Sequence, residues 1–76
     1  MNKQRRAEIE KALELLEQAQ GLLSDAASEE QDYYDNMPES FQSGERGDRA
    51  QEAATALGEA CDNIEAAIDA ARGAAE

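Results

Sequence analysis

The sequence predicts an all-α fold, an antiparallel two-helix hairpin with a short helical turn at the connection. Apolar residues recur at alternating spacings of four and three in both halves of the chain, which is the pattern of packed amphipathic helices. The two patterned stretches have similar lengths, and the chain's only proline lies between them. Two helices of matching length joined by a short connection pack most simply as a hairpin.

The first helix is predicted at about residues 7–34. The seam that should face the second helix consists of Ile9, Leu13, Leu16, Gln20, Leu23 and Ala27, widened by Ala12, Ala19 and Ala26. Leu15 and Leu22 lie seven residues apart on a neighbouring flank and would stay exposed to water in an isolated hairpin. Alternatively, these two leucines pack under the connecting segment.

The connection is predicted at residues 35–47. Asn36 followed three positions later by Glu39, with Pro38 in the first turn, matches the start of a short helix, because proline has no amide to leave unpaired. Ser43 and Gly44 should end this turn. Gly47 is expected as a bend or an unstrained position at the start of the next helix.

The second helix is predicted at about residues 48–75. Asp48 and Gln51 form a plausible capping pair at its start, and Ser43 is an alternative, earlier cap. Its seam follows the same spacing over almost four heptads: Ala50, Ala54, Leu57, Cys61, Ile64, Ile68, Ala71 and Ala75. Because half of these positions are alanine, the two helices should touch closely and bury little area.

Residues 1–76 are expected to form a single domain that associates with itself. A chain this short buries too small a fraction of its surface to be strongly stable alone. It has one cysteine and no histidine, so neither an internal disulfide nor a structural zinc site is expected. We therefore expect a homodimer that forms a four-helix bundle, or a higher helical oligomer.

The charge distribution bears on the partners. The net charge is −11, and residues 12–45 contain nine carboxylates and no base. This section would repel the phosphates of nucleic acid and of anionic lipid, so neither direct nucleic-acid binding nor membrane binding is expected. A basic protein is the natural complement; alternatively, the acidic exterior only maintains solubility. The N-terminal segment lacks the apolar core of a signal peptide, which favours a cytosolic location.

Large apolar side chains gather at the connection. They could form a hydrophobic plug that closes the end of the bundle, or a recognition surface, since Tyr, Phe, Met and Arg are enriched at interface centres. Both interpretations hold if Phe41 and Met37 lie inside while one tyrosine and Arg46 lie outside. The candidate binding residues are Tyr33, Tyr34, Asn36, Met37, Glu39, Phe41, Gln42, Glu45, Arg46 and Arg49.

The segment YYDNMPESFQSGERG, residues 33–47, followed by a helix rich in Ala, Glu, Leu and Ile, resembles a group of small uncharacterised phage and prophage proteins. The resemblance covers about the last two thirds of the chain. In this group Ser often stands where this chain has Gly44. The resemblance implies a phage accessory protein in a bacterial host, of the size class that includes counter-defence inhibitors and host takeover factors. The matching positions are Asn36, Met37, Pro38, Glu39, Gln42, Glu45, Arg46 and Gly47.

No catalytic activity and no cofactor or metal is expected. Without histidine there is no Ser-His or Cys-His pair, and Cys61 fits a small seam residue better than an activated thiolate. The acidic residues 32–39 lack the ligand spacing and loop glycine of an EF-hand.

Three function classes remain open. In the preferred one, the chain is a non-catalytic module that binds a host protein and masks a nucleic-acid-binding surface with its acidic side. In the second, an oligomer sequesters a cyclic nucleotide, with Arg46, Arg49 and the tyrosines clamping phosphate and stacking on the base. In the third, the hairpin is a structural component of the phage particle.

Overall fold

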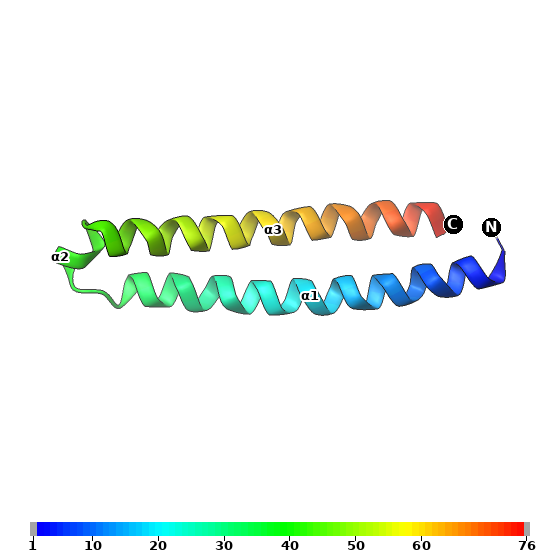
Figure 1. The fold of residues 1–76 in the computed structure, drawn as a ribbon, viewed down its shortest axis with the longest axis horizontal. Helices are drawn as coiled ribbons and strands as arrows, with labels where there is room; N and C mark the ends of the chain where they lie inside the picture. The colour runs from blue at the N-terminus through cyan, green and yellow to red at the C-terminus, as the bar shows by residue number, and fades with distance from the viewer. Residues whose placement is uncertain (1, 76) are drawn as a thin grey trace.

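The computed structural model describes residues 2–75 and contains three helices, α1 (Lys3–Asp35), α2 (Glu39–Gln42) and α3 (Glu45–Ala75). α1 and α3 run antiparallel, side by side along the length of the molecule, and α2 connects them at one end (Figure 1). The described residues include no strand. The predicted all-α class and the hairpin arrangement are confirmed.

Both long helices begin earlier than the heptad pattern indicates. α1 starts at Lys3 because Asn2 caps it: the side-chain oxygen Oδ1 of Asn2 accepts a hydrogen bond of 2.8 Å from the backbone N–H of Arg5. Asn is among the preferred residues at this position. α3 starts at Glu45, three residues before the expected position. Its first turn contains Glu45 and Asp48, whose negative charges suit the positive end of the helix dipole.

The predicted N-caps of the short helix and of the second helix are wrong, whereas Ser43 ends the short helix as predicted. Asn36 ends α1 instead of starting the short helix: its backbone N–H donates to the carbonyl of Asp32. Pro38 occupies the N-cap of α2 and makes no side-chain cap. Asp48 lies inside α3, where its backbone N–H donates to the carbonyl of Gly44 at 3.1 Å, so it cannot be the cap.

Ser43 closes α2 and does not cap α3. It is the C-cap of α2, and its hydroxyl donates back to the carbonyl of Glu39 at 3.2 Å. A serine hydroxyl bonded to the preceding turn is unavailable to the amides of the following helix.

The seam between α1 and α3 is thin. Ala50 and Ile68, each 3% exposed, are the buried hydrophobic residues of the described chain. No side chain of α1 is fully buried, and Ala12 is exposed and does not widen the seam. The other seam positions are half-buried: Ile9, Leu13, Leu16, Gln20, Leu23, Ala27, Ala54, Leu57, Cys61, Ile64, Ala71 and Ala75.

Polar contacts fix the register of the two helices. The side-chain amide of Gln20 donates to the backbone carbonyl of Cys61 at 3.3 Å and to the carboxylate of Glu65 at 2.6 Å. Nearer the open end of the hairpin, Arg72 forms an ion pair of 2.7 Å with Glu17. These contacts place Gln20 level with Cys61, near the middle of the rod.

A single hairpin leaves much apolar surface in water. Its radius of gyration is 17.2 Å, whereas a compact chain of 76 residues has one of about 11 Å. Its accessible surface is 5569 Å², against about 4,500 Å² for a compact protein of this mass. Leu15 and Leu22 are 53% and 71% exposed in the middle of α1, so they do not pack under the connection.

Candidate interaction surface

Gly47 allows α3 to begin directly against α2. It is buried, and a Cβ built on it would collide with the backbone of Gln42, 2.7 Å from that residue's Cα. No glycine among residues 2–75 has a positive φ, so the requirement is steric. Of the two expectations for Gly47, the bend is wrong and the unstrained position at the start of the next helix is confirmed. The residue lies in the first turn of α3 and permits a close approach of backbones.

The side chain of Gln42 connects α2 to the end of α1 through a hydrogen bond. Its side-chain amide donates to the backbone carbonyl of Tyr34 at 3.0 Å, and the same carbonyl accepts the N–H of Met37 at 3.1 Å. A carbonyl in the last turn of a helix has no partner within the helix, so these donors satisfy it. α2 therefore contacts α1 through the side chain of Gln42 and α3 through the backbone of Gln42, which lies against Gly47.

An exposed cluster of apolar and cationic side chains covers this end of the hairpin. Tyr33 is 53% exposed and Phe41 47% exposed. The guanidinium of Arg46 lies 5.4 Å from the centre of the Phe41 ring, within the range of a cation–π contact. We call this cluster the connection surface; it surrounds a depression of about 220 Å³ lined by Tyr33, Asn36, Met37, Pro38, Phe41 and Arg46.

The expected division between inside and outside is partly wrong. Phe41, expected inside, is close to half exposed, although the guanidinium of Arg46 lies over its ring. Met37 is half-buried, and of the two tyrosines Tyr34 is half-buried while Tyr33 points to solvent. The plug is therefore incomplete, and a large apolar area remains accessible.

A second, open depression of about 460 Å³ adjoins the connection surface. It is lined by Glu30, Tyr33, Arg46, Arg49, Ala50 and Ala53. Arg49 is already engaged in an ion pair of 2.6 Å with Glu45. An anionic ligand at this place would have to compete with Glu45 for Arg49 and would face the carboxylate of Glu30.

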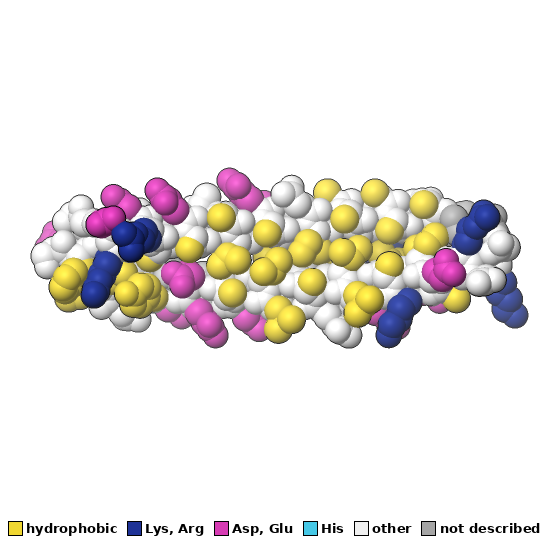
Figure 2. Space-filling view, viewed as in Figure 1, with side chains coloured by type: hydrophobic (Ala, Val, Ile, Leu, Met, Phe, Trp, Pro, Cys, Tyr) yellow, Lys and Arg dark blue, Asp and Glu magenta, His cyan; other side chains and the backbone are white. Residues whose placement is uncertain are grey.

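Carboxylates dominate the charge around the connection. Arg46 and Arg49 are the only bases between residues 12 and 71. The acidic residues of the surrounding sequence are Glu29, Glu30, Asp32, Asp35, Glu39, Glu45 and Asp48. The connection surface thus combines an apolar centre and two arginines with an acidic rim. In Figure 2, yellow and dark blue side chains meet at the end that carries α2.

The predicted binding residues divide into three groups. Five of them line the connection surface: Tyr33, Asn36, Met37, Phe41 and Arg46. Arg49 lines the adjoining depression, while Glu39 and Glu45 are exposed on the acidic rim. Tyr34 and Gln42 hold the connection together through their hydrogen bond. Pro38, which was not among the predicted site residues, also lines the surface, as its position between Met37 and Phe41 would have indicated.

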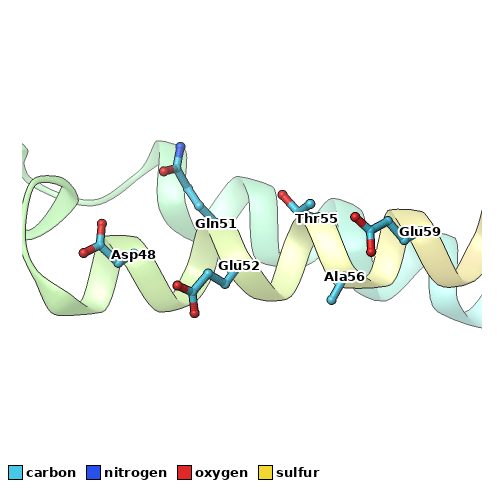
Figure 3. Close-up of a pocket in the computed structure, with 6 residues that line it drawn as sticks. All are labelled: Asp48, Gln51, Glu52, Thr55, Ala56 and Glu59. Carbon is cyan, nitrogen blue, oxygen red and sulfur yellow. The ribbon is translucent and has the colours of Figure 1, made fainter.

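A third depression lies on the outer surface of α3 (Figure 3). Its lining residues all belong to that one helix: Asp48, Gln51, Glu52, Thr55, Ala56 and Glu59. Because a single helix supplies the whole lining, the depression is a shallow strip between neighbouring side chains. Gln51 and Thr55 of this strip provide control positions for variants of the connection surface.

Residues 2–75 include no group of three or more Cys, Asp or Glu side chains that could hold a metal ion. No helix in this range is long and apolar enough to cross a membrane. Family models, curated proteins and solved structures were compared with the chain, and none of them matches.

Proposed function

We propose that this chain is a non-catalytic protein-interaction module that binds a partner protein through the connection surface. The observation that carries the proposal is the exposed group of Tyr33, Phe41 and Arg46 on a firmly held connection. Aromatic and arginine side chains are enriched at the centres of protein interfaces and among their energetically dominant contacts. Exposing two aromatic rings to water in an otherwise alanine-rich chain favours a binding role over a structural one.

The connection is preorganised for binding. The amide of Gln42 bonds to α1, and Gly47 seats α3 against the backbone of Gln42. A surface held in this way loses little conformational entropy when a partner binds, and that loss is a main cost of association. The charge of the rim indicates a partner with a basic surface around an apolar centre.

We base the biological setting of this proposal on the resemblance of residues 33–47 to phage proteins. In this setting the partner is a host protein in the bacterial cytoplasm, and the acidic rim competes with nucleic acid for its basic surface. The active form is a homodimer that forms a four-helix bundle, because one hairpin leaves Leu15 and Leu22 in water. Counter-defence is one outcome of such binding.

The proposal is tested by comparing the proteins that tagged copies retain from a bacterial lysate. The double variant Phe41→Ala, Arg46→Ala should lose a protein that the unaltered chain retains, because it lacks both the Phe41 ring and the guanidinium that lies over that ring. The control variant Gln51→Ala, Thr55→Ala alters the third depression and should retain it. Retention of the same proteins by all three copies would contradict the proposal, whereas elution of the specific protein by salt would support the charge complementarity.

Nucleotide sequestration is the second candidate, since Tyr33, Arg46 and Arg49 line one depression. The pairing of Arg49 with Glu45 and the nearby Glu30 disfavour a phosphate there. Thermal unfolding with and without cyclic nucleotides separates the two candidates. A saturable rise of the melting temperature that disappears in the Arg46→Ala variant would favour the nucleotide over the protein partner.

A further inference from the structure

α1 carries a second heptad stripe besides the seam that faces α3. Its spacing alternates between three and four from Ala12 to Ala26 and meets Tyr33 seven residues later. Residues that repeat at this spacing lie along one face of a helix. The stripe consists of Ala12, Leu15, Ala19, Leu22, Ala26 and Tyr33, in which both leucines and the tyrosine are more than half exposed.

α3 carries a matching stripe of small residues. Starting from Arg49, the same alternation runs through Ala53, Ala56, Ala60, Asn63, Ala67, Ala70 and Ala74. Tyr33 of the first stripe and Arg49 and Ala53 of the second line one depression, so both stripes lie on the same face of the hairpin. Figure 2 shows this arrangement: hydrophobic side chains on both helices and between them, with charged side chains mostly at the ends and edges.

We propose that two copies of the chain pair through this face in antiparallel orientation, with α1 against α1 and α3 against α3. The area is sufficient: the hairpin is 58 Å long and 15 Å wide, close to the roughly 800 Å² that each partner contributes to a standard interface. Pairing would also remove the excess surface described above. The alanines of α3 allow the two α3 helices to approach closely, while the leucines of α1 fill the wider side.

The side chains of the stripes fit the antiparallel register. When Ala19 of one copy lies against Leu22 of the second, Leu15 lies against Ala26, so each leucine meets an alanine. The two-fold axis then passes between residues 20 and 21 of α1. On α3 the antiparallel register sets Ala56 against Ala67 of the second copy, so the axis passes midway between these two positions. This midpoint lies beside Cys61, which is level with Gln20 of α1.

Asn63 supports the same orientation. It is exposed in the single hairpin and is the only polar residue between Ala53 and Ala74 in the α3 stripe. In the antiparallel register the two copies of Asn63 lie on either side of the axis, within reach of each other. With the connections at the same end, Asn63 would face the apolar stripe of α1 without a partner, and a buried amide without a hydrogen bond is costly.

The distribution of charge on α1 points the same way. Its start carries the bases Lys3, Arg5, Arg6 and Lys11, and its end is acidic. Antiparallel pairing brings Lys11 level with Glu30 of the second copy, and Arg6 level with Asp35. The opposite orientation would place bases beside bases and the two acidic connections side by side, which is repulsive.

The orientation has a consequence that rests on the proposed function. An antiparallel dimer presents one α2, with Phe41 and Arg46, at each end of a rod. The dimer is therefore bivalent: it can hold two partner molecules, or two sites of one oligomeric partner, at a fixed separation. Bivalent binding raises the apparent affinity without new contacts.

Disulfide cross-linking tests the orientation. In a Cys61→Ser background, copies with Ala56→Cys are mixed with copies with Ala67→Cys under mild oxidation. The mixture should give a covalent heterodimer, because these positions face each other across the interface. Each variant alone should cross-link at least about tenfold less, since its two cysteines lie about 16 Å apart along the rod and a disulfide needs Cα atoms within about 7 Å.

A second pair, Ala53→Cys with Ala70→Cys, repeats the test at another layer. Equal cross-linking of the single-variant samples, or no heterodimer from either mixture, would overturn the antiparallel pairing. No partner protein takes part in this experiment, so such a failure leaves the connection surface intact as a proposal. Conversely, cross-linking as expected with no specific partner retained would sink the proposed function alone.

Discussion

At the scale of single residues, Gly47 determines how closely α3 approaches α2. It permits α3 to start three residues earlier than the capping signals indicate and brings the backbone of α2 into contact with α3. The sequence leaves two interpretations of Gly47 open, a bend and an unstrained position at the start of the helix, and nothing in it indicates the contact with Gln42. The close approach depends on the position of Gln42 in space, which local sequence does not encode.

Gly47→Ala should lower the free energy of unfolding by about 1–3 kcal/mol, the usual cost of forcing an atom into a packed contact. Gly21→Ala is the matched control, since a Cβ there meets nothing within 4 Å and alanine favours a helix by up to about 1 kcal/mol. Urea unfolding followed by circular dichroism measures both at equal protein concentration. If Gly47→Ala raises the free energy of unfolding as much as Gly21→Ala does, the steric explanation of Gly47 is wrong.

Phe41 is the residue for which the prediction and the structure differ most at the site. Its apolar ring was expected to close the end of the bundle, but it lies about half exposed beneath Arg46. Composition and periodicity identify a side chain that can be buried, whereas its actual burial depends on neighbours that two helices and a four-residue turn do not supply. Tyr33 and Arg46, in contrast, lie outside, as an interaction surface requires.

At the scale of elements, periodicity is a reliable guide to the two helices and their facing sides. The alternating spacing specifies which residues of α1 and α3 meet, because every seam position of α3 is at least half-buried. The ends of the helices were harder to predict from the sequence. Asn2 extends α1, and Asp48, whose residue type is common at caps, lies within α3. A capping residue is identified by its backbone conformation, and several polar residues compete for each cap.

Ile68 should contribute more than other seam residues, because it is 3% exposed while Ile64 is half-buried. Ile68→Val should cost about 1 kcal/mol of unfolding free energy, and Ile64→Val clearly less, since a removed methylene group matters most where the site is closed. Thermal unfolding of both variants at one concentration provides the comparison. Equal losses would show that burial differs between the two sites less than the single hairpin indicates.

At the scale of the whole molecule, a rod of two helices has almost no interior. Residues 2–75 include two buried hydrophobic residues, and the elongated shape leaves the chain with more surface than a compact protein of its mass. The exposed flank of Leu15 and Leu22 could be recognised from the sequence because both lie off the seam. The shared face with the alanines of α3 could not, because it depends on how the two helices are rotated against each other.

The most direct test of this account is the mass of the chain in solution, measured by sedimentation equilibrium at micromolar concentration. The unaltered chain should have twice its mass of 8.2 kDa. Leu22→Glu should have the monomer mass and lower helicity, because a carboxylate replaces an apolar contact at the proposed interface. Ser24→Glu, on the opposite side of α1, should remain a dimer. A fully helical unaltered chain at 8.2 kDa, or the same mass for all three, would contradict the account.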